Sequence, residues 1–198
     1  MKALTALLAG LIILIFAVPF SGCTGFQKNL TEPSQMQMAD NNVQPSQTNE
    51  TTLPDWMYTP MTDCVTGNDI STSSLISADK PLIIHTFAVW CPACTKQLQE
   101  TTKLLKEEPG TYQFLAIDID SRENRDRIIS HIQKNKFTEG YYVSAPEEVL
   151  TGLIDTFGQR ILFTMPQTVV ICNKTVYLFR SGVAPSSLLK QNLERICS

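Results

Sequence analysis

Two cysteines separated by two residues, Cys91 and Cys94, directly follow an apolar run and constrain this sequence more than any other feature. The apolar run over residues 82–89 predicts a buried strand, and residues 95–108 predict a helix. With strand, turn and helix in this order, Cys91 lies at the N-terminus of the helix. There, free backbone N–H groups and the helix dipole stabilise a thiolate relative to a thiol. The spacing therefore predicts two thiols suited to disulfide exchange.

Within the pair, we expect Cys91 to attack a partner disulfide and Cys94 to resolve the mixed disulfide. Cys91 is nearer the start of the helix, whereas Cys94 lies one turn inside it and is more buried. Pro92 suits the first helical turn, because the N–H that proline lacks would have no partner there. Trp90 is expected to pack beside the thiols, although a plain core tryptophan fits the sequence equally well.

Two other interpretations of the cysteine pair are weaker. As half of a zinc site, the pair needs two further ligands, but no second pair has this spacing and His131 stands alone on an expected helix. As an inert structural disulfide, the pair closes a very short loop and constrains little of the unfolded chain. We therefore expect a redox-active disulfide between Cys91 and Cys94, with no metal and no other cofactor.

His85 interrupts the apolar strand six residues before Cys91 and is a candidate proton shuttle for the resolving thiol. The unperturbed pKa of histidine lies near neutrality, so a moderately buried imidazole can accept and return a proton. The alternative is a neutral, hydrogen-bonded histidine of the core. The sequence favours neither.

Two acidic residues, Asp118 and Asp120, lie on one face at the end of a second expected strand over residues 112–119. They suggest paired carboxylates for hydrolysis, but a strand end leading into a helix capped by Ser121 explains them more simply. Residues 122–127 are expected to form a solvated helix face.

The first 22 residues have the pattern of a secretory signal. Lys2 precedes an apolar stretch over residues 3–20, and Ser21-Gly22 stand immediately before Cys23. This arrangement resembles the lipobox of prokaryotic lipoproteins, which implies lipid attachment to Cys23 and cleavage before it. The alternative is an uncleaved anchor helix, because the apolar stretch is nearly long enough to span a bilayer. Either way, the rest of the chain is expected to be tethered to a membrane outside the cytoplasm.

The remaining chain divides into a tether and a folded domain. Residues 23–55 are rich in Gln, Asn, Thr, Ser and Pro and predict a flexible tether. Residues 56–198 are long enough for one domain with its own core. A small hairpin is expected over residues 57–73, after which strands alternate with helices until a final hairpin and helix. This order predicts an α/β sandwich around a central mixed sheet.

Three cysteines remain beside Cys23 and the reactive pair, namely Cys64, Cys172 and Cys197. Cys172 ends the first strand of the last hairpin, and the final helix is expected to carry Cys197 to the same end of the sheet. A bond between them closes a loop of 25 residues and contributes roughly 3 kcal/mol in the chain-entropy model. The alternatives are a bond between Cys64 and Cys197, or three free thiols.

The sequence resembles the thioredoxin superfamily, and within it the membrane-tethered TlpA/ResA type. The resemblance rests on Phe87-Ala88-Val89-Trp90-Cys91-Pro92-Ala93-Cys94, on Thr164-Met165-Pro166-Gln167-Thr168, and on an extra strand and helix over residues 140–157. It covers about residues 56–198. It implies a thioredoxin-like three-layer sandwich with a central mixed sheet, an N-terminal hairpin and this inserted strand and helix.

The resemblance also implies a docking surface. In that family the proline matching Pro166 has a cis peptide bond and faces the cysteine pair, whereas an ordinary trans loop is the alternative here. Met165 would then offer its backbone N–H and C=O groups to a substrate strand, with Trp90 and Pro92 beside it. The position of His85 often holds a buried acid in thioredoxin-like proteins, so the histidine departs from the pattern.

We therefore expect a membrane-anchored, extracytoplasmic thiol–disulfide oxidoreductase that acts on protein thiols and disulfides and exchanges electrons with a membrane donor or acceptor. The family resemblance implies the reductive direction, including thiol supply for cytochrome c maturation. Two other classes stay open: a thiol reductant linked to peroxide or methionine sulfoxide, and a non-catalytic partner-binding or metal-chaperone module on the same fold. The net charge of −3, without a basic stripe, argues against nucleic acid as a partner.

Overall fold

The computed structural model describes residues 44–45, 53–77 and 79–198. The predicted signal, the lipidation site at Cys23 and most of the predicted tether lie outside the described residues. Among the helices that are described, none is long and apolar enough to cross a membrane.

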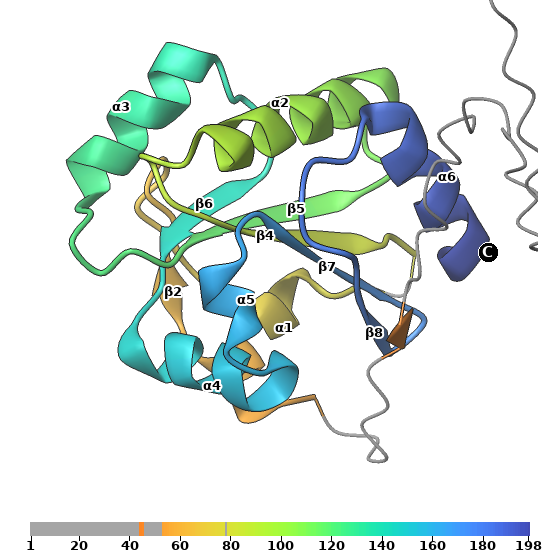
Figure 1. Ribbon diagram of the computed structural model, residues 1–198, viewed down its shortest axis with the longest axis horizontal. Coiled ribbons are helices and arrows are strands. Elements are labelled where there is room, and N and C mark those ends of the chain that lie inside the picture. The colour runs from red at the N-terminus through yellow and green to blue at the C-terminus, as the bar shows by residue number, and fades with distance from the viewer. Residues whose placement is uncertain (1–43, 46–52, 78) are drawn as a thin grey trace, which may run out of the picture. The chain divides into compact units, whose positions relative to one another are not determined.

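A mixed six-stranded sheet forms the centre of the domain, with strand order β1-β8-β7-β4-β5-β6 (Figure 1). Parallel pairing joins β4 to β5 and β5 to β6, and the other neighbours are antiparallel. The strands are β1 (Gln44–Pro45), β4 (Leu82–Phe87), β5 (Gln113–Asp118), β6 (Tyr141–Ser144), β7 (Gln167–Cys172) and β8 (Thr175–Leu178).

Helices cover both faces of this sheet (Figure 1). One face carries α2 (Pro92–Glu107), α3 (Arg125–Asn135) and α6 (Ser186–Cys197). The other face carries the 3-10 helix η1 (Asp55–Tyr58) and the helices α1 (Thr72–Leu75), α4 (Glu147–Phe157) and α5 (Arg160–Phe163). The predicted three-layer α/β sandwich is confirmed.

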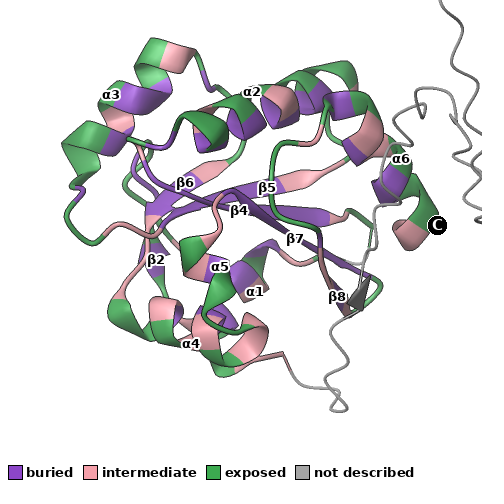
Figure 2. Cartoon of the chain, in the orientation of Figure 1, coloured by how far each residue is buried: buried purple, intermediate pink, exposed green. Residues whose placement is uncertain are grey.

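The central strand β4 supplies side chains to both cores, and every one of its residues is buried (Figure 2). Because side chains alternate along a strand, Ile83 and Phe87 pack beneath α2, whereas Leu82 and Ile84 pack against the opposite helices. A strand buried on both faces explains why its sequence is an almost continuous apolar run. His85 points to the same face as Ile83 and Phe87, toward α2.

The N-terminal hairpin is present but shorter than expected. It consists of β2 (Met61–Thr62) and β3 (Asp69–Ile70), which pair antiparallel. A β-bridge between Asp63 and Val143 and a hydrogen bond from Cys64 N–H to Tyr142 C=O at 2.8 Å attach it to β6. The buried carboxylate of Asp63 holds the turn, because it accepts hydrogen bonds from the N–H and hydroxyl of Thr66 and from the N–H of Tyr142.

Helix α3 begins later than the sequence predicted. Its N-cap is Asn124, whose side chain accepts a hydrogen bond from the N–H of Arg127 at 3.0 Å. The expected cap at Ser121 is therefore wrong, and the segment before Asn124 forms a turn instead. The inserted strand and helix predicted over residues 140–157 are present as β6 and α4.

Candidate active site

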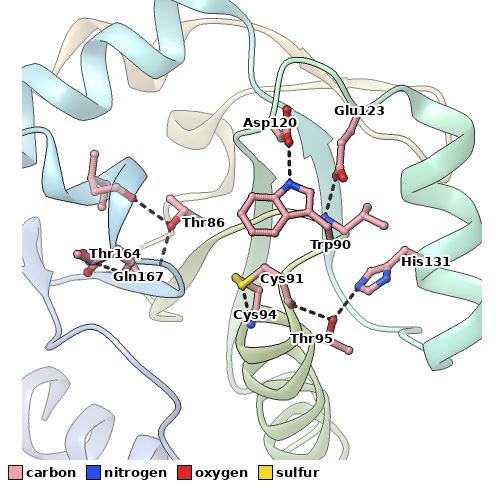
Figure 3. The surroundings of a disulfide bond; sticks show 12 residues. Thr86, Trp90, Cys91, Cys94, Thr95, Asp120, Glu123, His131, Thr164 and Gln167 are labelled. Carbon is pink, nitrogen blue, oxygen red and sulfur yellow. Dashed lines mark hydrogen bonds between the residues drawn. A yellow bond between two sulfur atoms is a disulfide. The ribbon is translucent and has the colours of Figure 1, made fainter.

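The two cysteines lie where β4 ends and α2 begins, at the carboxyl end of the central strand (Figure 3). Cys91 is the N-cap of α2 and forms a disulfide with Cys94, with the two Cα atoms 5.2 Å apart. The backbone N–H of Cys94 donates a hydrogen bond to Cys91 Sγ at 3.1 Å. An N–H group in the first turn of a helix, pointing at this sulfur, favours the thiolate when the disulfide is reduced.

The two sulfurs differ in access to solvent. Cys94 is 1% exposed and Cys91 is 7% exposed, and Pro92 beside Cys91 is on the surface. Helix α2 starts three residues before the helix predicted from Thr95, which places Cys94 inside its first turn. The geometry therefore makes Cys91 the more accessible sulfur.

Trp90 lies on the surface beside the disulfide, 55% exposed, so the alternative of a core tryptophan is wrong. Its indole Nε1 donates a hydrogen bond to Asp120 Oδ2 at 2.7 Å (Figure 3). The guanidinium of Arg122 donates two hydrogen bonds to the same carboxylate, and the backbone N–H of Arg122 donates a third. These bonds from Arg122 and Trp90 hold the pKa of Asp120 well below its ordinary value. The indole is thus fixed in place by a carboxylate that stays charged.

A buried pair of carboxyl groups stands behind this surface, and sequence reasoning missed it. Glu123 is buried, not part of a solvated helix face as expected, and its Oε2 accepts a hydrogen bond from Val89 N–H at 2.8 Å. Asp118 is also buried, and burial together with the charges of Glu123 and Asp120 raises its pKa to about 7. The carboxyl pair near the cysteines is therefore Asp118 with Glu123, whereas Asp120 turns outward to Trp90.

His131 also lies close to the cysteine pair, although no partner for it was predicted. The hydroxyl of Thr95 donates to the C=O of Cys91 at 3.2 Å and lies 3.4 Å from His131 Nε2 (Figure 3). The imidazole of His131 stacks on Phe87. Burial lowers the pKa of His131, and the charge of Glu123 acts in the opposite direction. Across residues 53–77 and 79–198, no three His, Cys, Asp or Glu side chains are grouped so that they can hold a metal ion.

His85 is fully buried between two hydroxyl groups. Its Nε2 lies 2.7 Å from Thr101 Oγ1 and its Nδ1 lies 3.0 Å from Thr168 Oγ1. Burial lowers the pKa of His85 to about 4, so the ring is neutral at physiological pH. The two hydroxyl partners and the lowered pKa are those of a neutral core histidine.

The loop that contains Met165 and Pro166 lies beside the disulfide. The Met165–Pro166 peptide bond is cis, and Met165 packs against the core cluster that includes Cys91 and Cys94. Two hydrogen bonds hold the loop: Gly182 N–H to Pro166 C=O at 3.1 Å, and Gln167 N–H to Thr86 Oγ1 at 3.4 Å. Within the described part of the chain, the backbone N–H and C=O of Met165 have no hydrogen-bond partner.

A second disulfide joins Cys172 to Cys197, with Cα atoms 5.6 Å apart. Ile171, next to Cys172, pairs with Leu82 at the start of β4. This disulfide therefore lies at the end of the sheet opposite the Cys91–Cys94 pair. Cys64 is buried and free, so the alternative bond between Cys64 and Cys197 is not formed.

Comparisons with known proteins agree with this architecture. The model of the AhpC/TSA family matches residues 50–177, and no curated protein matches the sequence. A thiol:disulfide interchange protein of the thioredoxin family from Chlorobium tepidum has a TM-score of 0.59 at 17% identity, covering 81% of this chain and 100% of that one.

Two further solved structures are similar. A secreted disulfide oxidoreductase of Mycobacterium tuberculosis, homologous to DsbE of Escherichia coli, has a TM-score of 0.57 at 14% identity and covers 73% of this chain and 100% of that one. The exposed lipoprotein thioredoxin of Streptococcus pneumoniae has a TM-score of 0.55 at 17% identity and covers 70% of this chain and 98% of that one. At these identities the likeness shows the fold, and the predicted thioredoxin-like fold is confirmed.

Proposed function

The chain belongs to the AhpC/TSA family and is an oxidoreductase with the thioredoxin fold, and we propose that it exchanges disulfides with partner proteins outside the cytoplasm. One observation carries this proposal: a disulfide at the start of α2 whose accessible sulfur, that of Cys91, accepts a hydrogen bond from the backbone N–H of Cys94. That N–H group stabilises negative charge on the sulfur that must attack or leave.

In the reductive direction, the Cys91 thiolate attacks one sulfur of the partner's disulfide. A mixed disulfide forms, and the partner's other sulfur leaves as a thiolate that takes up a proton. Cys94 then loses its proton and attacks Cys91 Sγ, which closes the Cys91–Cys94 disulfide and releases the partner's second thiolate. The partner gains two electrons and the pair loses two. The partner's two thiolates take up two protons, which balance the proton lost when the Cys91 thiolate formed and the proton lost by Cys94. The oxidative direction is the reverse of these steps.

Docking of the partner is assigned to the surface around Cys91. Trp90 and Pro92 are exposed on one side of the pair, and Met165 and Pro166 form the neighbouring loop. Because the polar backbone groups of Met165 are unpaired among the described residues, they can bond to an extended segment of the partner. Such pairing would hold the partner's cysteine close to Cys91 Sγ.

We further infer the reductive direction, membrane anchoring through lipid on Cys23, and a membrane electron donor. The direction rests on the resemblance to the TlpA/ResA type, in which thiols are supplied for cytochrome c maturation. The anchor rests on the Ser21-Gly22-Cys23 pattern. The similar pneumococcal protein is described as an exposed lipoprotein thioredoxin, which supports the same location.

The proposal is tested with insulin as the disulfide substrate and dithiothreitol as the electron source. The wild-type domain is expected to accelerate insulin reduction, and Cys91→Ser to abolish the acceleration. Cys94→Ser is expected to accumulate the mixed disulfide, which non-reducing electrophoresis detects. A Cys91→Ser variant with full activity would overturn the proposal, and so would turnover of hydrogen peroxide faster than that of any disulfide.

A further inference from the structure

Large apolar side chains that are exposed are few in the described residues, and three of the five lie on segments around the disulfide. These three are Trp90 (55% exposed), Phe163 (78%) and Val183 (37%). The other two, Tyr58 and Val65, belong to η1 and to the turn of the N-terminal hairpin. Since exposed apolar surface can mark an interaction site, their placement on the segments next to one disulfide needs an explanation.

The segment that carries Phe163 is fixed to the central strand. Phe163 is the last residue of α5 and stands two residues before Met165. Thr86 is the penultimate residue of β4, and its hydroxyl donates to the C=O of Ile161 at 3.4 Å. Gln167 Nε2 donates to the C=O of Thr164 at 2.9 Å. Figure 3 shows Thr164, the neighbour of Phe163, on the side of the disulfide away from His131.

The segment that carries Val183 is fixed to α2. Gly182 N–H bonds to Pro166 C=O at 3.1 Å, and Ala184 N–H bonds to Gln97 Oε1 at 2.6 Å. Gln97 lies one turn after Cys94 on α2. Val183 is therefore held between the Pro166 loop and the helix that carries the cysteine pair.

Phe163 itself does little for the stability of the fold, because most of its side chain faces solvent. Burial of such a ring against a partner would remove apolar surface from water and so favour binding. Beside Trp90, Arg122 neutralises the charge of Asp120. The exposed apolar surfaces of Trp90, Phe163 and Val183 therefore fit an apolar segment of a partner.

We propose that Phe163 is a specificity-determining residue, which binds an apolar side chain of the protein substrate close to the substrate's reactive cysteine. The inference rests on the proposed function, because exchange at Cys91 Sγ forces the substrate chain across this surface. In an extended segment, residues two apart lie about 7 Å from one another on the same face. A side chain two positions from the substrate cysteine is therefore the one that we expect to contact Phe163.

The test uses synthetic peptides that contain a single intramolecular disulfide and differ at one position. One set carries Leu two residues before or after the attacked cysteine, and the matched set carries Ser there. Stopped-flow measurements give the second-order rate constant of each peptide with the reduced domain. The wild type is expected to prefer one Leu peptide by about tenfold, as one well-buried apolar group allows, and Phe163→Ser to lose that preference.

Two controls separate a specific role of Phe163 from a general loss of reactivity. Tyr58→Ser removes a similarly exposed ring from η1 and is expected to keep the wild-type preference. Oxidised glutathione offers no apolar side chain at this distance, so its rate is expected to be equal in the wild type and in Phe163→Ser. A preference for Leu that survives Phe163→Ser, or no preference in the wild type, overturns the role of Phe163. Failure of the wild type to react with glutathione and with every peptide would instead overturn the proposed function.

Discussion

The carboxylate of Glu123 accepts a hydrogen bond from the N–H of Val89 at 2.8 Å, two residues before Cys91 in the chain. The same carboxylate contributes, after burial itself, to raising the pKa of Asp118 to about 7. Two buried carboxyl groups therefore stand behind the turn that presents the cysteine pair, and one of them changes protonation near neutral pH. The free energy of unfolding of the domain should therefore depend on pH in this range.

Asp118→Asn is expected to flatten the dependence of stability on pH. The folded-state pKa of Asp118, about 7, lies above the ordinary value of 3.8. Protonation of Asp118 thus contributes its full share of the free energy of unfolding below about pH 4, and this share is lost as pH rises through 7. We expect the loss to be on the order of 1–3 kcal/mol. Urea unfolding between pH 4 and 8 measures it. Asp155→Asn, on the exposed surface of α4, should keep the wild-type slope, and equal slopes for wild type and Asp118→Asn would refute the assignment.

His85→Ala is expected to lower the free energy of unfolding by about 2–4 kcal/mol, because it opens a cavity and removes a hydrogen-bond partner from each of two buried hydroxyls. These hydroxyls belong to Thr101 and Thr168. If His85 is a neutral core residue, the rate at which Cys94 resolves a mixed disulfide should stay unchanged. Stopped-flow kinetics separate attack from resolution, and slower resolution with normal attack would restore the proton-shuttle hypothesis.

Trp90→Phe is expected to raise KM for a protein disulfide while kcat is largely kept. The substitution removes the hydrogen bond from the indole to Asp120, and a hydrogen bond of this kind contributes about 0.5–1.5 kcal/mol, or roughly a twofold to twelvefold change in KM. Steady-state insulin reduction gives both constants. A proportional fall of kcat instead would mean that Trp90 acts on the chemical step, not on docking.

Cys197→Ser is expected to destabilise the domain by roughly 3 kcal/mol, since it opens the loop closed with Cys172. Insulin reduction at 25 °C should be unchanged, because this disulfide lies at the far end of β4 from the reactive pair. Denaturant unfolding and the activity assay test both statements, with Cys64→Ser as the control that leaves both disulfides intact. A comparable loss of activity in Cys197→Ser would contradict the separation of the two sites.

Cys23→Ser is expected to move the protein from the membrane fraction into the soluble extracytoplasmic fraction, or to leave it unprocessed with its signal attached. Lipid on Cys23 supplies the membrane affinity in the proposal, and serine has no thiol to carry it. Fractionation with immunoblotting and metabolic labelling with radioactive palmitate measure the outcome. Full membrane retention with a cleaved N-terminus would refute lipid anchoring.

The elements that depend on local sequence patterns were predicted well. Strand β4 and the start of α2 follow from an apolar run and from cysteine spacing, both of which are local. The order of strands and helices then left few ways to build the sheet. The short helix α5 was missed because its four residues are too few to show a helical period.

The supporting groups of the site were missed for a different reason. Glu123 and His131 reach the cysteine turn from residues that follow β5, so their roles depend on packing across the sheet. In the sequence, Glu123 stands between Arg122 and Arg127 and has the composition of a solvated face. Only the late start of α3 at Arg125 turns its carboxylate inward.

The opposite placement of the two disulfides sets how many electrons the domain carries in one cycle. In the proposed function Cys91–Cys94 reacts with the partner, whereas the Cys172–Cys197 bond ties β7 to the last helix at the other end of β4. Each encounter therefore transfers one pair of electrons, and the remaining bond keeps α6 attached while the first is open. In the proposed function the protein is then a two-electron carrier whose scaffold keeps its own cross-link during turnover.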